Sequence, residues 1–349
     1  MTIVADSYLF VVGVDTHTRT HTFAILDTHT NAVTKTDTFP TTEAGIRRAL
    51  TWITRHTHHQ PLVVIEGIGS YGAHLATTAT HQGYTVVEPM PIPAAARHGH
   101  GKTDPMDAIW IARSVLGTDT TKLRYPRDDH GIRAALRVLI VARDHISTER
   151  TRSINALTAL VRTINLGIDA RQRLTPTQIR HISTWRHRDE PLAHATARHE
   201  AIRLATRILT MDHELKDNHT HIHTLIRTSP AACLLHHIGI GPISAATIYL
   251  AWSHPGRIHS EAGFANMAGT APIPASSGNT TRHRLNRGGD RRLNQAINTI
   301  AITRLRCDPQ TRAYHHKRLA QGLTSKEIRR ILKRYITRQI YRTLEHQPA

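Results

Sequence analysis

Four carboxylates in the N-terminal third have the types and spacing that suit divalent metal ions. Asp15 and Glu66 each end a run of apolar, β-branched residues, whereas Asp104 and Asp107 lie three residues apart. The latter spacing places both carboxylates on one face of a helix. Carboxylates that gather at one point repel each other unless cations neutralise them, and their hard oxygen ligands suit Mg²⁺ or Mn²⁺. Two such ions can bind the attacking and the leaving oxygen of a phosphodiester.

Each of these acids also has a purely structural interpretation. A single Asp after a strand is usually a turn former or a helix cap. Asp104 precedes Pro105, as an N-cap residue precedes a proline at the first helical position. Taken together, the four acids favour a catalytic site over four separate caps.

The elements that must position these acids alternate in type along the first 125 residues. Three strands come first as a meander, and the later strands alternate with helices, which predicts a mixed α/β sheet domain. The expected strands are 9–15, 22–27, 32–39, 61–66 and 85–88, and the expected helices are 43–57, 71–82 and 104–116.

Positive charge is concentrated in the rest of the chain. Of the 349 residues, 45 are Lys or Arg and 26 are Asp or Glu, a net charge of +19. Residues 1–125 hold ten of each sign, so the whole excess lies in residues 126–349, and residues 277–349 alone hold 17 basic and 4 acidic residues. This excess indicates a polyanionic partner, most simply nucleic acid, rather than a small metabolite or a solvated basic face.

Other classes of protein find little support. Cys233 and Cys307 cannot form a disulfide framework or a cysteine zinc site, and the 28 histidines are spread too widely to indicate zinc. The apolar run 8–14 lacks a basic lead-in, so no signal peptide is expected, and no run is long enough to span a bilayer or apolar enough to anchor at one. We therefore expect a cytoplasmic protein that associates with the nucleoid and not with a membrane.

Beyond residue 126 the pattern is helical. Apolar residues at three- and four-residue steps predict one long helix or a broken pair over 132–164 and a second long helix over 195–226, with Pro176 and Pro191 between them. This arrangement predicts an antiparallel hairpin or coiled coil that serves oligomerisation. The expected domains are 1–125 for the acids, 126–230 for the hairpin and 231–349 for a mainly helical, basic domain.

Gly239 and Gly241 lie between two helical patterns in the basic domain. A Gly-hydrophobic-Gly turn resembles a helix-hairpin-helix, in which backbone N–H groups approach a DNA phosphate. The alternative is an ordinary glycine turn between helices.

The segments around the acids resemble those of the insertion-sequence 110 transposases, also called the IS116/IS902 type, which include the Piv invertases. The matching segments are Val12-Gly-Val-Asp15, Ile65-Glu66-Gly67 with Tyr71, and Lys102-Thr-Asp104-x-x-Asp107-Ala. The resemblance implies a RuvC-like, RNase H-like fold. It also implies that the four acids form a DEDD motif, which binds divalent metal and acts in DNA cleavage.

A second segment resembles the C-terminal domain of the same family. Gly269-Thr-Ala-Pro272 is followed by four residues, then Ser277-Gly278, and then the basic stretch that starts at Arg287. The resemblance implies that Ser277, or its neighbour Ser276, attacks a DNA phosphate and forms a phosphoserine intermediate. The arginines expected to hold DNA are Arg282, Arg284, Arg287, Arg291 and Arg292. Without the resemblance, Ser276-Ser-Gly is a plain flexible loop.

The resemblance also implies partners. The family assembles dimers and tetramers in which the acids of one chain work with the serine of another, and a structured bridge RNA pairs with donor and target DNA. Two other functions fit the residues: a RuvC-like, metal-dependent, structure-specific nuclease in which water attacks, and a non-catalytic nucleic-acid-binding protein.

Overall fold

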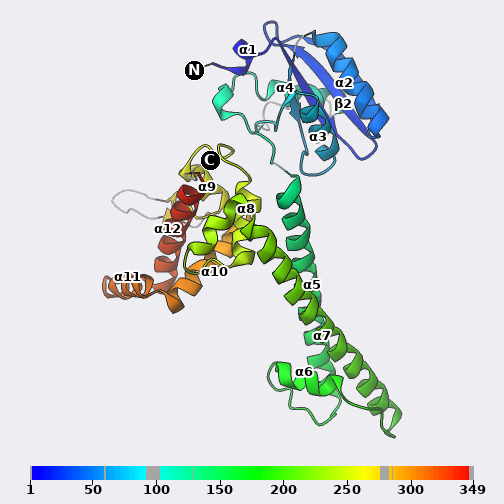
Figure 1. The fold of residues 1–349 in the computed structure, drawn as a ribbon, viewed down its shortest axis with the longest axis vertical. Helices are drawn as coiled ribbons and strands as arrows, with labels where there is room; N and C mark the ends of the chain where they lie inside the picture. The colour runs from blue at the N-terminus through cyan, green and yellow to red at the C-terminus, as the bar shows by residue number, and fades with distance from the viewer. Residues whose placement is uncertain are drawn as a thin grey trace. The chain divides into compact units, whose positions relative to one another are not determined.

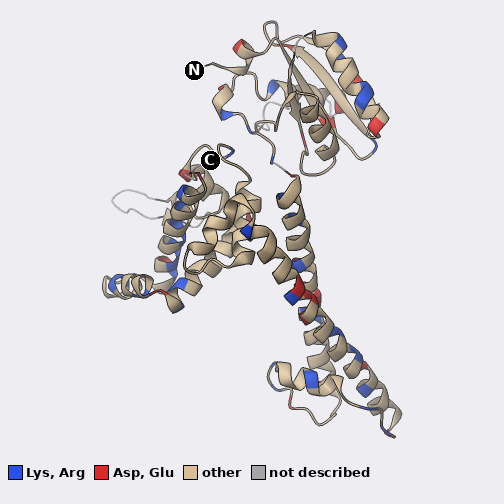
Figure 2. Cartoon of the chain, in the orientation of Figure 1, with Lys and Arg blue, Asp and Glu red and all other residues tan. Residues whose placement is uncertain are grey.

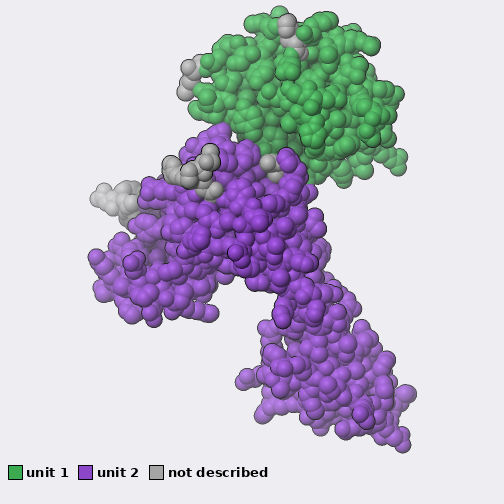
Figure 3. All heavy atoms as spheres, viewed as in Figure 1, with its two compact units in different colours: residues 1–127 green, residues 128–349 purple. Residues whose placement is uncertain are grey.

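The chain folds as two compact units. The computed structural model describes residues 2–58, 60–91, 103–127, 129–275, 283–284 and 286–345. Residues 1–127 form the first unit and residues 128–349 the second, coloured separately in Figure 3. The further division of the second unit at residue 230 remains a prediction.

The first unit contains a five-stranded mixed sheet in the order β3-β2-β1-β4-β5. β1 pairs antiparallel with β2 and parallel with β4, while β3 extends the antiparallel side and β5 the parallel side. This sheet confirms the predicted α/β fold. The strands are β1 (Phe10–Thr16), β2 (Thr20–Asp27), β3 (Val33–Pro40), β4 (Leu62–Ile65) and β5 (Thr85–Val87).

Helices cover both faces of this sheet (Figure 1). α2 (Glu43–Thr57) and α3 (Ala73–His81) form one core with the sheet, and α4 (Asp104–Arg113) forms a second core on the opposite face. A short helix α1 (Val4–Ser7) and a 3-10 turn η2 (Thr120–Lys122) lie at the ends of the unit.

Alternation along β1 decides which side chains face α4. Val12 and Val14 belong to the core with α2 and α3, whereas Val11 belongs to the core with α4. Successive side chains of a strand point to opposite faces, so Gly13 and Asp15 face α4 as well. A Cβ on Gly13 would lie 2.1 Å from the carbonyl oxygen of Ala108. Only glycine therefore lets α4 lie this close to the central strand.

The second unit is built on the predicted antiparallel hairpin. α5 (Gly131–Thr163) and α7 (Leu192–Arg227) lie side by side, with the short helix α6 (Pro176–Ser183) at the far end (Figure 1). At 1.5 Å per residue, each long helix extends about 50 Å. Asn218 of α7 donates a hydrogen bond to the Leu139 carbonyl oxygen of α5, which fixes the register.

The hairpin joins two separate apolar cores across a polar middle. One core lies at the α6 end, and the other lies where both helices meet the rest of the unit. Between them, Arg150 donates to Asp212 at 2.5 Å, Arg207 pairs with Glu149, and Arg143 donates to the Leu215 carbonyl oxygen. Figure 2 shows both charge signs gathered there.

Shorter elements complete the second unit around the second of these cores. Within the described residues they are η3 (Pro230–His236), α8 (Pro242–Trp252), α9 (Glu261–Met267), β6 (Ile273–Pro274), β7 (His283–Arg284), α10 (Arg291–Cys307), α11 (Pro309–Ala320) and α12 (Ser325–Glu345). The mainly helical character of this region is confirmed. Among the described helices, none is long and apolar enough to cross a membrane.

An ion pair at the α6 end of the hairpin is expected to stabilise the fold in a pH-dependent way. Buried Arg198 donates to both carboxylate oxygens of Glu190, at 2.7 and 2.5 Å, and lies 4.9 Å from the centre of the Trp185 ring. These hydrogen bonds lower the pKa of Glu190. The stabilisation is therefore complete above the unfolded-state pKa and is lost as the pH falls through the lower folded-state value.

We expect Glu190→Gln to lower the thermal unfolding midpoint at pH 7, because Arg198 would keep a buried charge without its carboxylate. This deficit should shrink as the pH falls below about 4.5, where the wild-type carboxylate also becomes protonated. The matched control is Glu200→Gln, which removes a solvent-exposed ion pair with Arg203 on α7, the helix that also carries Arg198. This variant should change the unfolding midpoint little. Equal midpoints for both variants would contradict the prediction.

Candidate functional site

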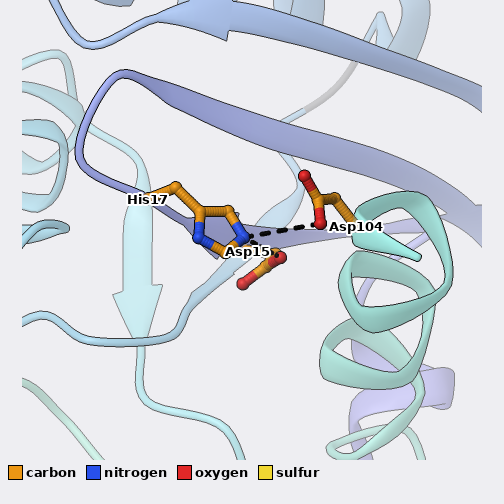
Figure 4. A group of neighbouring side chains, drawn as sticks. All are labelled: Asp15, His17 and Asp104. Atoms are coloured by element: carbon orange, nitrogen blue, oxygen red, sulfur yellow. Dashed lines mark hydrogen bonds and ion pairs between the residues drawn. The ribbon is translucent and has the colours of Figure 1, made fainter. Parts of the chain in front are cut away.

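Three side chains converge at the end of β1. Asp15, His17 and Asp104 each offer one ligand atom, and these atoms lie within 4.8 Å of one another. His17 Nε2 lies 2.9 Å from Asp15 Oδ2 and 3.6 Å from Asp104 Oδ1. Figure 4 shows one imidazole nitrogen facing both carboxylates, with Asp104 at the start of α4. Two carboxylate oxygens and an imidazole nitrogen form a donor set compatible with a divalent metal ion.

Asp15 is the buried member of this cluster, with 8% of its surface exposed. Burial raises the pKa of the Asp15 carboxyl, the charge and hydrogen bond of His17 lower it, and the charges of Asp107 and Asp104 raise it again. Asp107 therefore lies close enough for its charge to influence the pKa of Asp15. A buried carboxylate among like charges is stabilised by a cation, so the arrangement fits the predicted metal.

The start of α4 leaves the Asp104 carboxylate free for this cluster. Thr103, rather than Asp104, is the N-cap residue, and Pro105 lies in the first turn. The helix begins with the Asp107 N–H donating to the Thr103 carbonyl oxygen at 3.0 Å. The cap interpretation of Asp104 is thus wrong.

Glu66 follows β4 directly, and its backbone is hydrogen-bonded to β1. The Glu66 N–H donates to the Val14 carbonyl oxygen at 3.1 Å, and the Thr16 hydroxyl donates to the Glu66 carbonyl oxygen at 3.0 Å. Its side chain is exposed and is not one of the three that converge. Its role as a metal ligand remains a prediction.

Sequence reasoning missed His17. The signal was available, because Asp15 and His17 are two residues apart at a strand end, where such residues share a face. It was hidden by the large number of histidines, which made each one look like a bias of composition.

Two glycine turns hold the basic segment of the second unit in place. Gly269 and Gly289 both have positive φ, at 62° and 92°. A Cβ on Gly289 would lie 2.4 Å from the Met267 carbonyl oxygen, and one on Gly269 would lie 2.9 Å from the Gly288 carbonyl oxygen. The segments after α9 and before α10 therefore touch through their backbones.

Between the two glycine turns in sequence, β6 and β7 pair antiparallel, with Ile273 opposite Arg284. The segment that joins the two strands in sequence contains Ser276, Ser277 and Arg282, which lie outside the described residues. Residues on either side of the Ser276-Ser-Gly segment thus form a two-stranded ribbon, which the local sequence pattern does not predict.

The predicted DNA-binding arginines differ in their surroundings. Arg284 is exposed on β7, and Arg287 and Arg291 are exposed before and at the start of α10. Arg292 pairs with Asp144 of α5 at 2.8 Å, so part of its charge is already neutralised. Figure 2 shows further Lys and Arg residues along α11 and α12.

Gly239 and Gly241 form the turn before α8, as predicted, but the space around the two residues differs. Gly239 has φ of 82°, and a Cβ there would lie 3.2 Å from the Ile300 carbonyl oxygen of α10. Gly241 is the N-cap residue of α8 and has open space around it. The element before the turn, η3, is a 3-10 helix rather than an α-helix. Of the two, Gly241 is the position that a phosphate could approach.

Comparisons with known proteins match both parts of the chain. A family model described as a transposase, of the IS110 type with a DEDD motif, matches residues 12–166. A second model, described as the transposase IS116/IS110/IS902 family, matches residues 231–316. The chain is also 27% identical over 273 residues to an uncharacterized 42 kDa protein of insertion element IS900 from Mycobacterium paratuberculosis, an alignment that covers 66% of this chain and 68% of that protein. The first match contains all four acids, and the second contains both serines and all five arginines.

Proposed function

We propose that this chain, which belongs to the IS116/IS110/IS902 family of insertion-sequence transposases, cuts and rejoins DNA. The proposed reaction uses divalent metal ions and a serine nucleophile. The observation that carries the metal part is the convergence of Asp15 and Asp104 at the end of β1. The serine part rests on the resemblance of the segment around Ser277.

The acids would hold the metal at the edge of the sheet. Asp15 and Asp104 would be ligands, and Asp107 and Glu66 would complete the set. A bound Mg²⁺ or Mn²⁺ would supply charge stabilisation for the phosphate oxygens as the phosphodiester reacts. His17 would position the Asp15 carboxylate through its 2.9 Å contact.

Ser277 would carry out the transfer itself. Its Oγ forms a bond to phosphorus and loses its proton to a base, while the bond from phosphorus to one deoxyribose oxygen breaks and that oxygen takes up a proton to leave as a hydroxyl. The phosphoserine conserves the phosphodiester energy, so the reverse attack by a deoxyribose hydroxyl rejoins a strand without a further energy source. Exposed arginines such as Arg284 and Arg287 would offset charge on the phosphate.

The proposed partners follow from the same chemistry. A transposase binds DNA, and recombination needs donor and target strands together, which favours a dimer or tetramer. We also propose a bridge-type non-coding RNA that pairs with both DNAs, and the basic second unit suits the backbone of such an RNA.

Covalent trapping tests the serine. Protein, Mg²⁺, host RNA and DNA spanning the junction of the element would be mixed and resolved on a denaturing gel. We expect a protein–DNA adduct with wild type that is lost in Ser277→Ala. The matched control is Ser276→Ala, which should keep the adduct.

Three other results would each change the proposal. An adduct lost only in Ser276→Ala would move the nucleophile by one residue. Free cleavage products without an adduct, unchanged in Ser277→Ala, would replace the proposal with a metal-dependent nuclease that uses water. Absence of any product, with DNA and RNA both bound, would leave a nucleic-acid-binding protein.

A further inference from the structure

An open cavity of about 360 Å³, lined by polar residues and glycines, lies where the segment before α10 meets α10 and α12. It borders the glycine turn that contains Gly288 and Gly289. Its walls carry cationic and amide side chains: Arg287, Arg291, Asn294, Gln295, Asn298 and Lys333.

Lys333 is fixed in this cavity by a chain of hydrogen bonds. Its ammonium donates to Asn294 Oδ1 at 2.6 Å, and Asn294 Nδ2 donates to the carbonyl oxygens of Ala268 and Gly269, at 2.7 and 3.3 Å. The amide therefore has one orientation, with its oxygen toward the lysine. An ammonium has three N–H donors, of which this bond uses one.

The charge in the cavity is not balanced among the described residues that line it. Three cations, Arg287, Arg291 and Lys333, face one acid, Asp290. The Asp290 carboxylate already accepts the backbone N–H groups of Arg292 and Leu293, at 2.8 and 3.0 Å, as the cap of α10. Its Oδ1 atom is therefore engaged by the start of α10, and one acid against three cations leaves an excess of positive charge.

The surroundings of the Lys333 ammonium favour the binding of an anion. Burial lowers the pKa of the Lys333 ammonium, and the neighbouring charges of Arg329 and Arg330 lower it further. An anion bound in the cavity would reverse both effects, because it supplies the opposite charge and new hydrogen-bond acceptors.

We propose that this cavity binds one backbone phosphate of the DNA, with Lys333 and Asn298 as contacts that neither the DEDD motif nor the serine segment includes. Tetrahedral phosphate oxygens match a fixed ammonium, amide N–H groups and flanking guanidinium groups. DNA is the favoured source because the residues that line the cavity from Asn286 to Arg291 follow the Ser277 segment closely in sequence. The inference rests on the proposed function in this choice of ligand.

Binding rather than cleavage tests the proposal, so the result is independent of whether Ser277 reacts. Labelled 30-mers of double-stranded DNA, single-stranded DNA and RNA would be titrated by fluorescence anisotropy across a series of salt concentrations. We expect Lys333→Ala to weaken DNA binding about tenfold and to reduce the salt slope by about one. Asn298→Asp, which adds a negative charge to the same cavity, should weaken it at least as much.

Two controls keep the test interpretable. Lys317→Ala removes an exposed lysine from α11, outside the cavity, and should weaken binding by no more than about twofold. Lys333→Arg keeps the charge and should recover most of the affinity, while circular dichroism melts confirm that each variant is folded. Equal losses in Lys333→Ala and Lys317→Ala would overturn the proposal, and so would a loss confined to RNA.

Discussion

Replacing Asp15 by Asn is expected to reduce metal-dependent DNA cleavage about 10³-fold. The substitution keeps the shape of the side chain but removes the one buried charge at the point where β1 ends and α4 begins. The metal would then lose its central ligand, and its charge on the reacting phosphate would be lost with it. Single-turnover cleavage of junction DNA in Mg²⁺ measures the effect.

The same variant should also bind metal more weakly in the absence of DNA, which Mn²⁺ titration followed by electron paramagnetic resonance can detect. Asp37→Asn is the matched control, because Asp37 is exposed on the edge strand β3 and takes no part in the cluster. Unchanged cleavage and unchanged Mn²⁺ binding in Asp15→Asn would show that the cluster does not hold the catalytic metal.

The second large effect is expected from Gly13→Ala, which should destabilise the first unit by about 3 kcal/mol, at the high end for an overpacked core. The added Cβ would lie 2.1 Å from the Ala108 carbonyl oxygen and 2.5 Å from the Ala112 nitrogen. Both are backbone atoms of α4, so the helix itself must move away from β1. Denaturant unfolding of the intact chain, followed by circular dichroism, measures the loss.

This displacement should also separate Asp104 from Asp15, because α4 carries Asp104 in its first turn. Cleavage is thus expected to fall even where the variant remains folded. Gly117→Ala is the control: it follows α4, has no heavy atom within 4 Å of its added Cβ, and should change stability by less than about 0.5 kcal/mol. If Gly13→Ala behaved like Gly117→Ala, close packing of α4 would not be what positions the site.

Local pattern was enough to predict most elements of the fold. The helix expected over 132–164 is Gly131–Thr163, and the strand expected over 9–15 is Phe10–Thr16. Both are set by the spacing of apolar residues, which the sequence displays directly. The β6–β7 ribbon was missed because each strand has two residues, too few for any alternation to be visible.

The site was predictable only in part, because its geometry depends on contacts between distant segments. Asp15 and Asp104 were found from their types and their places at element ends. The free carboxylate of Asp104 depends on Thr103 taking the N-cap position, a choice that the sequence leaves open. The pairing of Arg292 with Asp144 and the place of Lys333 in a cavity beside α10 depend on tertiary packing alone.

The polar middle of the α5–α7 hairpin has a consequence for how the second unit opens. The two apolar cores share helices but no buried side chain, since charged and amide contacts separate them. Cooperativity in proteins passes mainly through contiguous apolar packing, so each core can behave as its own foldon. The α6 end can therefore unfold and refold locally, as hydrogen exchange would register it, while the core that supports α8, α10 and α12 stays intact.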